Sequence, residues 1–404
     1  MAEETRLPVD IDAQPLVQAA AALRPVLRLY QEEIEREQRL PQALVEQLRE
    51  AGCYRLVIPR ALGGLQTDPL TYLRAVELLA EGAGSVGWNI ANNSVGQLVT
   101  LGLPDEGVDE IYAHGADTVI AGTAVPGGGQ ALPVEGGYRV SGRWSFGSGC
   151  QESAWMLGSF QVLDGGQPRR RPDGGSLYWR GVFPRAEAEI VPGSWDVAGL
   201  RGTGSFDWTV EDVFLPERRT MPHAGIPLDN QWERWPGVTY SLPVQCWVGP
   251  HHSAVITGIA RAGIDALIEL AGGKQPRGRP AGLLGENPQV QDAVGRADAI
   301  LNAGRVYRSA MIAELWNTVA AGKSTTLEQR TRCRLAAIYA ADSAREAMDL
   351  MYRHGGSTSF QRASRLAECW RDLHVVGQTV TIAPEWYPIG GRVYLGMDPG
   401  PRLR

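Results

Sequence analysis

The chain has 404 residues, 44% hydrophobic and 21% charged, a balance typical of a globular protein large enough for two or three subdomains. A net charge of −6 argues against nucleic-acid binding, which requires a basic face, and five cysteines without a CxxC spacing exclude a disulfide framework and a zinc site. Because we find neither a secretory signal nor an apolar run long enough to span a bilayer, we expect a soluble, cytoplasmic protein that binds no membrane.

The first part of the sequence predicts helices. Between residues 11 and 115, apolar residues recur at spacings of three and four, with acids and arginines on the opposite face. Pro41 near the start of one stretch and Gly52 at its end are typical of helix boundaries. We therefore expect an N-terminal helical domain at residues 1–117.

The middle of the sequence predicts β structure. Gly, Pro, Val, Thr and aromatic residues dominate from about residue 118, in short runs separated by turn signals. This pattern indicates a β domain of about one hundred residues, which we expect to be barrel-like and to span residues 118–222.

Helical periodicity returns in long amphipathic runs between about residues 240 and 385. Several of these runs exceed the usual length of a globular helix, which favours a bundle. The closing stretch PIGGRVYLGMDPGPRLR predicts an irregular tail. We expect a C-terminal four-helix bundle with this tail at residues 223–404, and hence a mainly α fold with a central β domain.

Several common catalytic fingerprints are missing from the sequence. The glycine cluster GLRGTGSFD at 199–207 lacks the third glycine of a nicotinamide-binding motif, and we find no Walker motif and no GxSxG elbow. The six histidines show no HExxH spacing, and the adjacent His251 and His252 would face different directions on a helix. We therefore expect no metal site.

Two glycine-rich stretches carry most of the functional signal. GTAVPGGGQA at 122–131 and GGYRVSGRWSFGSG at 136–149 both end in small residues, which can expose backbone N–H groups to the edge of a ligand. Two ordinary hairpins would give the same pattern. Near the C-terminus, Asp372 and His374 lie two residues apart, so on a helix they diverge, and His374 alone fits either a structural role or a bundle pocket.

In order and pattern, these segments resemble the acyl-CoA dehydrogenase superfamily over roughly residues 15–395. The stretch GYRVSGRWSFGSG is similar to the strand that borders the flavin ring in that family. DVAGLRGTGSFDWTVEDVFLPERR resembles a later family segment, and YRHGGS followed by RLAECWRDLH resembles the family's glycine turn and Arg-Asp signature.

The departures from the dehydrogenase pattern favour one branch, the group D two-component flavin-dependent monooxygenases. This branch includes phenol, secosteroid, dibenzothiophene and indole oxygenases. Val380 stands near the place of the dehydrogenase's catalytic glutamate, while the residues 144–149 and 371–374 match the monooxygenase patterns W-x-F-x-S-G and R-D-x-H. Several of these relatives carry a second histidine where this chain has Thr379. An acyl-CoA dehydrogenase and a flavin-free scaffold of the same fold stay as alternatives.

The resemblance implies an oxygenase component that works with reduced flavin, either FAD or FMN, and with O2 as co-substrate. A separate NAD(P)H-dependent reductase would supply the flavin, and a C4a-hydroperoxyflavin would hydroxylate a small phenol- or indole-like aromatic substrate. The family usually forms homotetramers, so we expect one here.

The resemblance also implies site residues. Ser148, with Ser145 as the alternative, would contact flavin N5 and the peroxide, and Trp144 and Phe146 would wall the flavin ring. His374 would act as acid or base on the substrate side, and Asp372 would orient neighbouring groups. Further implied contacts are Thr123, Arg277, Gln289, Gly355 and Gly356 for the flavin, and Asn92, Asn93 and Gln97 for the substrate. A strand end, or a helix with amides on its wet face, would explain the serines and the amides without a ligand.

Overall fold

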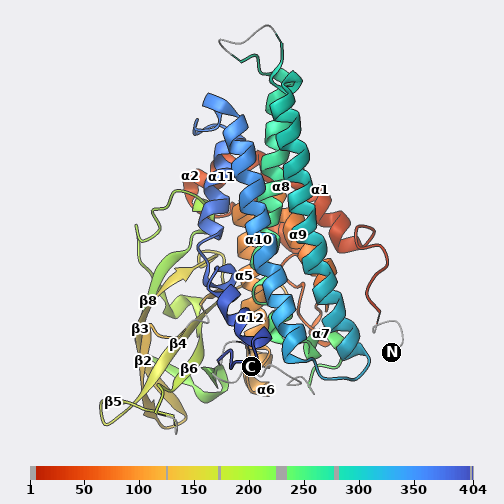
Figure 1. The fold of residues 1–404 in the computed structure, drawn as a ribbon. Coiled ribbons are helices and arrows are strands. Elements are labelled where there is room, and N and C mark those ends of the chain that lie inside the picture. Colours follow the sequence, from red (N-terminus) through yellow and green to blue (C-terminus); the bar gives the residue numbers. More distant parts are fainter. Residues whose placement is uncertain are drawn as a thin grey trace.

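The computed structural model describes residues 6–123, 126–171, 174–223, 234–276, 282–400 and 403. N-terminal helices pack against a long C-terminal bundle, and a sheet lies beside one end of that bundle (Figure 1). The order of helices, sheet and helices confirms the predicted fold class. None of the helices in these ranges is long and apolar enough to cross a membrane.

Helices fill the described chain before the first strand, as predicted. They are α1 (Pro15–Leu29), α2 (Gln31–Glu37), α3 (Gln42–Glu50), α4 (Pro69–Gly82), α5 (Gly84–Thr100) and α6 (Asp105–Ile111). The predicted boundaries of α3 are confirmed, because Pro41 is its N-cap and Gly52 follows its end with a φ of +77°, which favours glycine. At the start of α4, the Asp68 carboxylate accepts hydrogen bonds from the backbone N–H groups of Leu70 and Thr71.

The central domain is a mixed sheet. Its strands are β1 (Ile120–Gly122), β2 (Gly129–Val134), β3 (Gly137–Gly147), β4 (Trp155–Asp164), β5 (Gln167–Pro168), β6 (Tyr178–Pro184), β7 (Glu189–Ile190), β8 (Phe206–Pro216) and β9 (Thr220–Pro222). Hydrogen bonds connect them in the order β7-β8-β3-β2-β4-β6-β9, with β1 and β5 also paired to β4. Among the described strands this order does not close on itself, so the sheet is open rather than a complete barrel.

The two faces of the sheet bury different cores. Side chains alternate between faces along a strand, so Trp144, Phe160 and Trp208 form the core of the β domain on one face. On the other face, Leu157 and Val182 pack in a cluster that includes residues of the N-terminal helices. The sheet is therefore held against the helical part through its second face.

Four helices form the C-terminal bundle: α8 (Pro250–Gly273), α9 (Pro288–Ala320), α10 (Leu327–His354) and α11 (Arg365–Val376). Helix α8 is buried along most of its length and packs against α4, α5, α10 and α11. Gly258 permits the close approach of α4, because a Cβ there would lie 2.3 Å from the Glu77 carbonyl oxygen. A short helix, α7 (Val238–Ser241), precedes the bundle.

The expectation of an irregular C-terminal tail is wrong for its first part. Residues Trp386–Tyr394 form helix α12, on which Trp386, Ile389 and Val393 pack in a small cluster with Ile338 of α10. The glycine pair 390–391 hid this helix, but one of the two glycines is required by packing. A Cβ at Gly390 would lie 2.8 Å from a methyl carbon of Leu335.

All five cysteines are free and buried. Burial raises the pKa of the thiols of Cys53, Cys150 and Cys369 to about 12. These thiols are therefore protonated at neutral pH and behave as small apolar groups.

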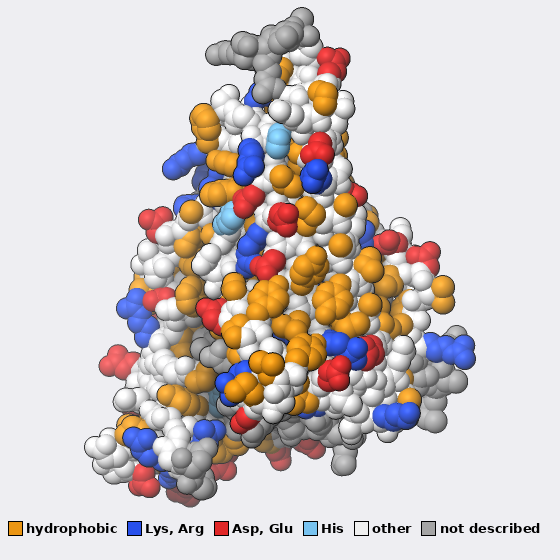
Figure 2. All heavy atoms as spheres, in the orientation of Figure 1, with side chains coloured by type: hydrophobic (Ala, Val, Ile, Leu, Met, Phe, Trp, Pro, Cys, Tyr) orange, Lys and Arg blue, Asp and Glu red, His pale blue; other side chains and the backbone are white. Residues whose placement is uncertain are grey.

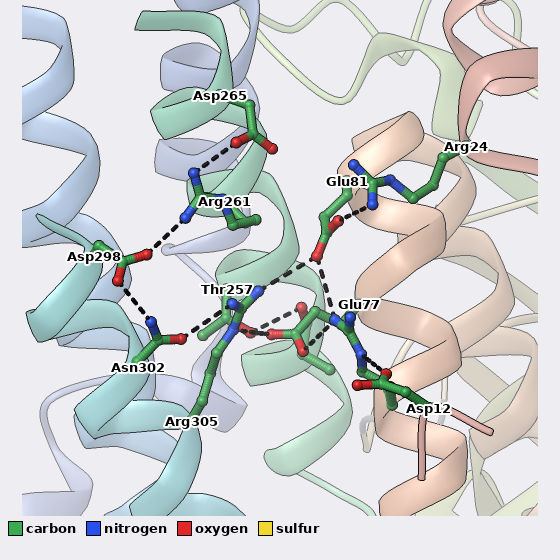
Figure 3. Close-up of polar contacts among 12 residues, drawn as sticks. Asp12, Arg24, Glu77, Glu81, Thr257, Arg261, Asp265, Asp298, Asn302 and Arg305 are labelled. Carbon is green, nitrogen blue, oxygen red and sulfur yellow. Dashed lines mark hydrogen bonds and ion pairs between the residues drawn. The ribbon is translucent and has the colours of Figure 1, made fainter. Parts of the chain in front are cut away.

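A buried ion cluster joins the N-terminal helices to the bundle (Figure 3). Glu77 of α4 is only 3% exposed, and its carboxylate lies 2.7 Å from the Arg305 guanidinium of α9 and 2.5 Å from the Thr257 hydroxyl of α8. Arg308, also buried, lies 3.7 Å from the same carboxylate. Glu81, one turn further along α4, pairs with Arg24 of α1 at 3.2 Å. One carboxylate pair thus connects four helices.

The cluster gives a stability prediction at Glu77. Burial works to raise the pKa of this carboxyl, but Arg305, Arg308 and the Thr257 hydroxyl outweigh it and hold the pKa below its usual value. We expect Glu77→Gln to lose about 3–5 kcal/mol of unfolding free energy, because the buried Arg308 guanidinium loses its carboxylate partner and Arg305 keeps only its longer contact with Glu81. Urea unfolding at pH 7 measures the loss.

The pH dependence follows from the sign of the shift. A lowered pKa stabilises the fold above the pKa of the unfolded state and loses that contribution as pH falls. The difference in unfolding free energy between wild type and Glu77→Gln should therefore become smaller below about pH 4. Glu269→Gln, which removes an exposed ion pair with Arg28, is the matched control and should change stability by less than about 1 kcal/mol. Equal stability of Glu77→Gln and Glu269→Gln would contradict the stabilising role assigned to the buried Glu77 carboxylate.

Candidate functional site

The end of β3 turns sharply into the protein. The pairing of β3 with β8 shifts register between Trp144 and Gly147, and Phe146, inside this bulge, has a φ of +67°. Phe146 is 65% exposed, whereas Ser148 is only 8% exposed. The bulge thus places an exposed aromatic ring and a buried hydroxyl two residues apart.

A run of hydroxyl groups ties Ser148 to the segment before β8. The Thr203 hydroxyl donates to the Leu200 carbonyl at 2.8 Å. The hydroxyl oxygens of Thr203 and Ser205 lie 2.7 Å apart, as do those of Ser205 and Ser148. Each hydroxyl has one proton. Because Thr203 uses its proton on the carbonyl, Ser205 must donate to Thr203, and Ser148 must then donate to Ser205.

The donor count leaves Ser148 with one free lone pair. The indole N–H of Trp88, on α5, donates to the Ser148 hydroxyl oxygen at 3.0 Å and occupies the other lone pair. Ser148 can therefore accept a hydrogen bond from an N–H or O–H group of a bound molecule, but it has no proton left to donate.

Trp88 also connects Ser148 to the bundle. Its ring stacks on the imidazole of His252, with centroids 4.3 Å apart and planes at 12°. His252 lies near the start of α8, and its Nδ1 is 2.6 Å from the hydroxyl of Thr381, in the turn Val380–Ile382 after α11. We call Ser148, Trp88, His252 and Thr381 the Ser148–His252 cluster.

Asp372 holds the hydroxyl run in place from the bundle side. Its carboxyl is fully buried in α11 and accepts a hydrogen bond from the Leu200 backbone N–H at 2.7 Å. Burial raises the pKa of Asp372 to about 8, and Glu368 and Glu35 add to the increase. Asp372 therefore contacts the backbone that starts the run, and its predicted orienting role stays a prediction.

The prediction that Trp144 walls a ligand ring needs correction. Its indole lies in the β-domain core, stacked on Trp208 with centroids 4.2 Å apart, and its N–H donates to the carbonyls of Gly127 and Ser159. The alternation along β3 directs this side chain to the inner face. Phe146 and Ser145, by contrast, are exposed beside the bulge.

Two of the three amides predicted to bind substrate serve the fold. The buried Asn93 accepts from the Ile120 N–H at 2.9 Å, and the buried Gln97 donates to the carbonyls of Tyr54 and Thr118. Both side chains therefore tie α5 to its neighbours, while the Asn93 amide nitrogen and the Gln97 amide oxygen have no partner in the described structure, so the substrate contacts stay a prediction. Asn92 is half-buried on the same face as Trp88, and its amide donates to the Trp88 carbonyl at 2.9 Å.

His374 does not join the Ser148–His252 cluster through its polar or ring contacts. Its Nε2 lies 3.1 Å from an Asp349 carboxylate oxygen, and its ring lies 4.4 Å from that of Trp370. Its predicted role as acid or base stays a prediction.

The other residues predicted to contact the flavin lie on several elements, with Gly355 beside the end of α8. Lys274 donates to the Gly355 carbonyl at 2.7 Å, and the turn continues through Gly356 with a φ of +61°. Gln289 is exposed in the first turn of α9, and Arg277 lies outside the described residues. Thr123 follows β1, where its N–H donates to the Leu157 carbonyl. No described contact tests a flavin role for these residues.

The polar atoms around Ser148 fit the edge of a flavin ring. Asn89, one residue after Trp88, is buried, and neither its amide nitrogen nor its amide oxygen has a hydrogen-bond partner in the described structure. A Cβ at Gly149 would lie 3.6 Å from that nitrogen, an ordinary contact distance, so the backbone after β3 lies beside Asn89. A flavin edge offers both N–H and C=O groups, which match an unpaired amide and the free lone pair of Ser148.

Sequence reasoning missed several members of this site. Ser205 and Thr203 lie in the segment that carried the family resemblance, but only the fold brings their hydroxyls to Ser148. Trp88 and Asn89 lie in the stretch of α5 that contains the predicted substrate amides, but they were not chosen among them. His252 was considered only as a metal ligand, and within the described ranges no group of His, Cys, Asp or Glu is arranged to hold a metal ion.

Comparisons with known proteins show the family of this chain. Residues 17–105 match the family "Acyl-CoA dehydrogenase, N-terminal domain" and residues 251–383 match "Acyl-CoA dehydrogenase, C-terminal domain". The chain is 31% identical to the indole-3-acetate monooxygenase of Pseudomonas putida over 91% of its length and 90% of that protein. It is 30% identical to the flavin-dependent monooxygenase oxygenase subunit HsaA of Rhodococcus jostii, over 95% of this chain and 94% of that protein.

A solved structure gives the same result. The 3-HSA hydroxylase from Rhodococcus sp. superposes with a TM-score of 0.87 at 28% identity, over 96% of this chain and 98% of that chain. The similarity therefore includes the helices, the sheet and the bundle.

Asp372 provides a test of how the site is held together. An acid whose pKa is raised by folding stabilises the fold at low pH and loses that contribution as pH rises toward the folded value. Asparagine keeps an acceptor for the Leu200 N–H without titrating. We therefore expect Asp372→Asn to gain stability relative to wild type as pH rises from about 4 to about 8.

Denaturant unfolding at several pH values measures this difference. Asp372→Ala is the matched control, because it leaves the buried Leu200 N–H without an acceptor and should lose about 1–3 kcal/mol relative to the asparagine variant at every pH. If the unfolding free energies of wild type and Asp372→Asn changed with pH in parallel, the raised pKa of the Asp372 carboxyl would be contradicted.

Proposed function

Because the chain belongs to the acyl-CoA dehydrogenase family and, within it, to the oxygenase subunits of flavin-dependent monooxygenases, we propose that it hydroxylates a small phenol- or indole-like aromatic compound with reduced flavin and O2. The observation that carries the proposal is the free lone pair of Ser148. It can accept from the N–H group that reduced flavin carries at N5, and it lies beside the aromatic pair of Trp88 and His252.

Reduced flavin, when bound, supplies the electrons that activate O2. The residues of this chain would hold and shield it. Ser148 would accept the N5–H bond, Asn89 would complete the polar edge, and the exposed ring of Phe146 would cover the flavin. The turn at Gly355, with Lys274 beside it, would bind the nucleotide end of the flavin. Burial of Ser148 and His252 keeps bulk water from the reacting groups.

A separate reductase is the proposed source of reduced flavin. The sequence has no nicotinamide fingerprint, and relatives carry the names "oxygenase subunit" and, for a resorcinol hydroxylase of Rhizobium sp., "FADH(2)-dependent" and "oxygenase component". We infer an NAD(P)H-dependent flavin reductase that works with FAD or FMN. Five free thiols support a cytoplasmic location.

A homotetramer would cover an exposed apolar surface on the bundle. Figure 2 shows hydrophobic side chains gathered over α9, α10 and α12. Exposed members on these helices are Val306, Tyr339, Tyr387 and Tyr394. Surfaces of this kind are typical of subunit interfaces.

A dehydrogenase is the less favoured function. Proton abstraction from an acyl thioester needs a base, and the place of the family's glutamate holds Val380, which is exposed, followed by Thr381. A dehydrogenase would purify yellow with bound oxidised FAD, whereas the proposed oxygenase binds reduced flavin more tightly than oxidised flavin. Measuring the affinity for oxidised flavin and for reduced flavin distinguishes the dehydrogenase from the oxygenase. A protein that binds neither form would favour a flavin-free scaffold.

The proposed role of Ser148 predicts uncoupling on its removal. In Ser148→Ala, the N5–H group loses its acceptor, so we expect hydroxylated product to fall about tenfold while hydrogen peroxide per NADH rises. A reductase-coupled assay with FMN and with FAD measures both products. Ser145→Ala is the matched control and should stay coupled, because Ser145 is exposed and outside the hydroxyl run. Wild-type coupling in Ser148→Ala would overturn the role.

A further inference from the structure

The turn after α11 has no titratable side chain where relatives are expected to hold their acid or base. Thr379, Val380 and Thr381 occupy these positions. The structure brings a histidine to this turn from elsewhere, because the Nδ1 of His252 on α8 lies 2.6 Å from the Thr381 hydroxyl. His252, 129 positions before Thr381 in the sequence, thus supplies a titratable side chain that the turn itself lacks.

The other ring nitrogen of His252 has no partner. His252 is 5% exposed, and its Nε2 makes no hydrogen bond in the described structure. A buried polar atom without a partner destabilises the folded protein. A ligand that supplies the missing hydrogen bond would remove this destabilisation. His252 and Ser148 both contact Trp88, the first by ring stacking and the second by a hydrogen bond, so we assign the unpaired atom to the same site.

The surroundings of His252 keep its ring neutral. On its own helix His251 lies against it, with ring centroids 3.7 Å apart, and Arg334 of α10 donates to the Thr381 carbonyl at 3.1 Å. The contacts from α5 and from the turn, Trp88 and Thr381, are uncharged. Burial, His251 and Arg334 together hold the pKa of His252 well below its usual value.

We propose that His252 is a further catalytic residue, whose neutral imidazole contacts the reacting hydroxyl or ring N–H of the aromatic substrate through Nε2. The proposal rests on the function proposed above. The Thr381 hydroxyl can donate or accept, so it permits either tautomer of the ring. When Thr381 donates to Nδ1, Nε2 carries the proton and donates to a phenolate oxygen. When Thr381 accepts, Nε2 is free to accept from an indole N–H.

The same arrangement favours the ionised form of a phenol. The bound phenol releases its proton to solvent, and the phenolate oxygen accepts the Nε2–H bond near the positive charge of Arg334. A phenolate ring is richer in electrons than a phenol and accepts an electrophilic oxygen atom more readily. His252 thereby selects substrates with an ionisable group at the reacting end.

The test uses 4-nitrophenol, whose ionised form is coloured, and the flavin-free protein in the dark. We expect binding to wild type to lower the pKa of the probe by about one unit or more, a tenfold change in ionisation. In His252→Leu the shift should disappear and the affinity for the phenolate should fall about tenfold. His252→Gln, which keeps an N–H donor, should retain most of both.

His114→Leu, an exposed histidine outside the site, is the matched control and should bind like wild type. Should the leucine variant fail to fold, Thr381→Val removes the hydroxyl that bonds Nδ1, and we expect a loss of about two- to tenfold. An unchanged shift in His252→Leu, or no probe binding by a wild-type enzyme that hydroxylates a phenol, would overturn the proposal. Failure to bind reduced flavin would instead overturn the proposed function.

Discussion

The hydrogen bond from the Leu200 N–H to the Asp372 carboxyl connects the bundle to the β domain, and the geometry of the site depends on it. Leu200 has a φ of +53°, a conformation that costs free energy for a non-glycine residue and persists when neighbouring groups fix it. Its carbonyl receives the Thr203 hydroxyl, and that contact fixes the direction of every later proton in the run to Ser148. A carboxyl on α11 thereby determines what a serine at the end of β3 can offer to a ligand.

The sequence identified some parts of this site for physical reasons and missed others for equally physical ones. Small residues at the end of a strand pointed to Ser148, because glycine-rich backbone permits close approach. Trp144 was assigned wrongly, since the alternation along β3 directs its side chain to the inner face, and only the bulge that follows exposes Phe146. Asn93 and Gln97 look like ligand contacts, yet they satisfy backbone groups of neighbouring segments. His252 could not be assigned, because helix α8 is buried on nearly all sides and no periodicity shows which residues face the site.

The molecule treats buried charge in two opposite ways. Between the N-terminal helices and the bundle, Glu77 is surrounded by Arg305, Arg308 and a hydroxyl, so its charge is fully compensated. Around His252 the neighbours are basic or uncharged. The first arrangement stabilises the fold without any ligand. The second is completed only when an electron-rich group binds, which is the pattern expected of a functional site.

The burial of the five cysteines has a consequence for an enzyme of this chemistry. An oxygenase that activates oxygen faster than it hydroxylates substrate releases hydrogen peroxide within its own active site. Thiols react with peroxide as thiolates, and burial raises the pKa of Cys150, two residues from Ser148, to about 12. The thiol of Cys150 is therefore both buried and protonated at neutral pH. We therefore expect the packing of the fold to slow inactivation by cysteine oxidation, without a dedicated protective group.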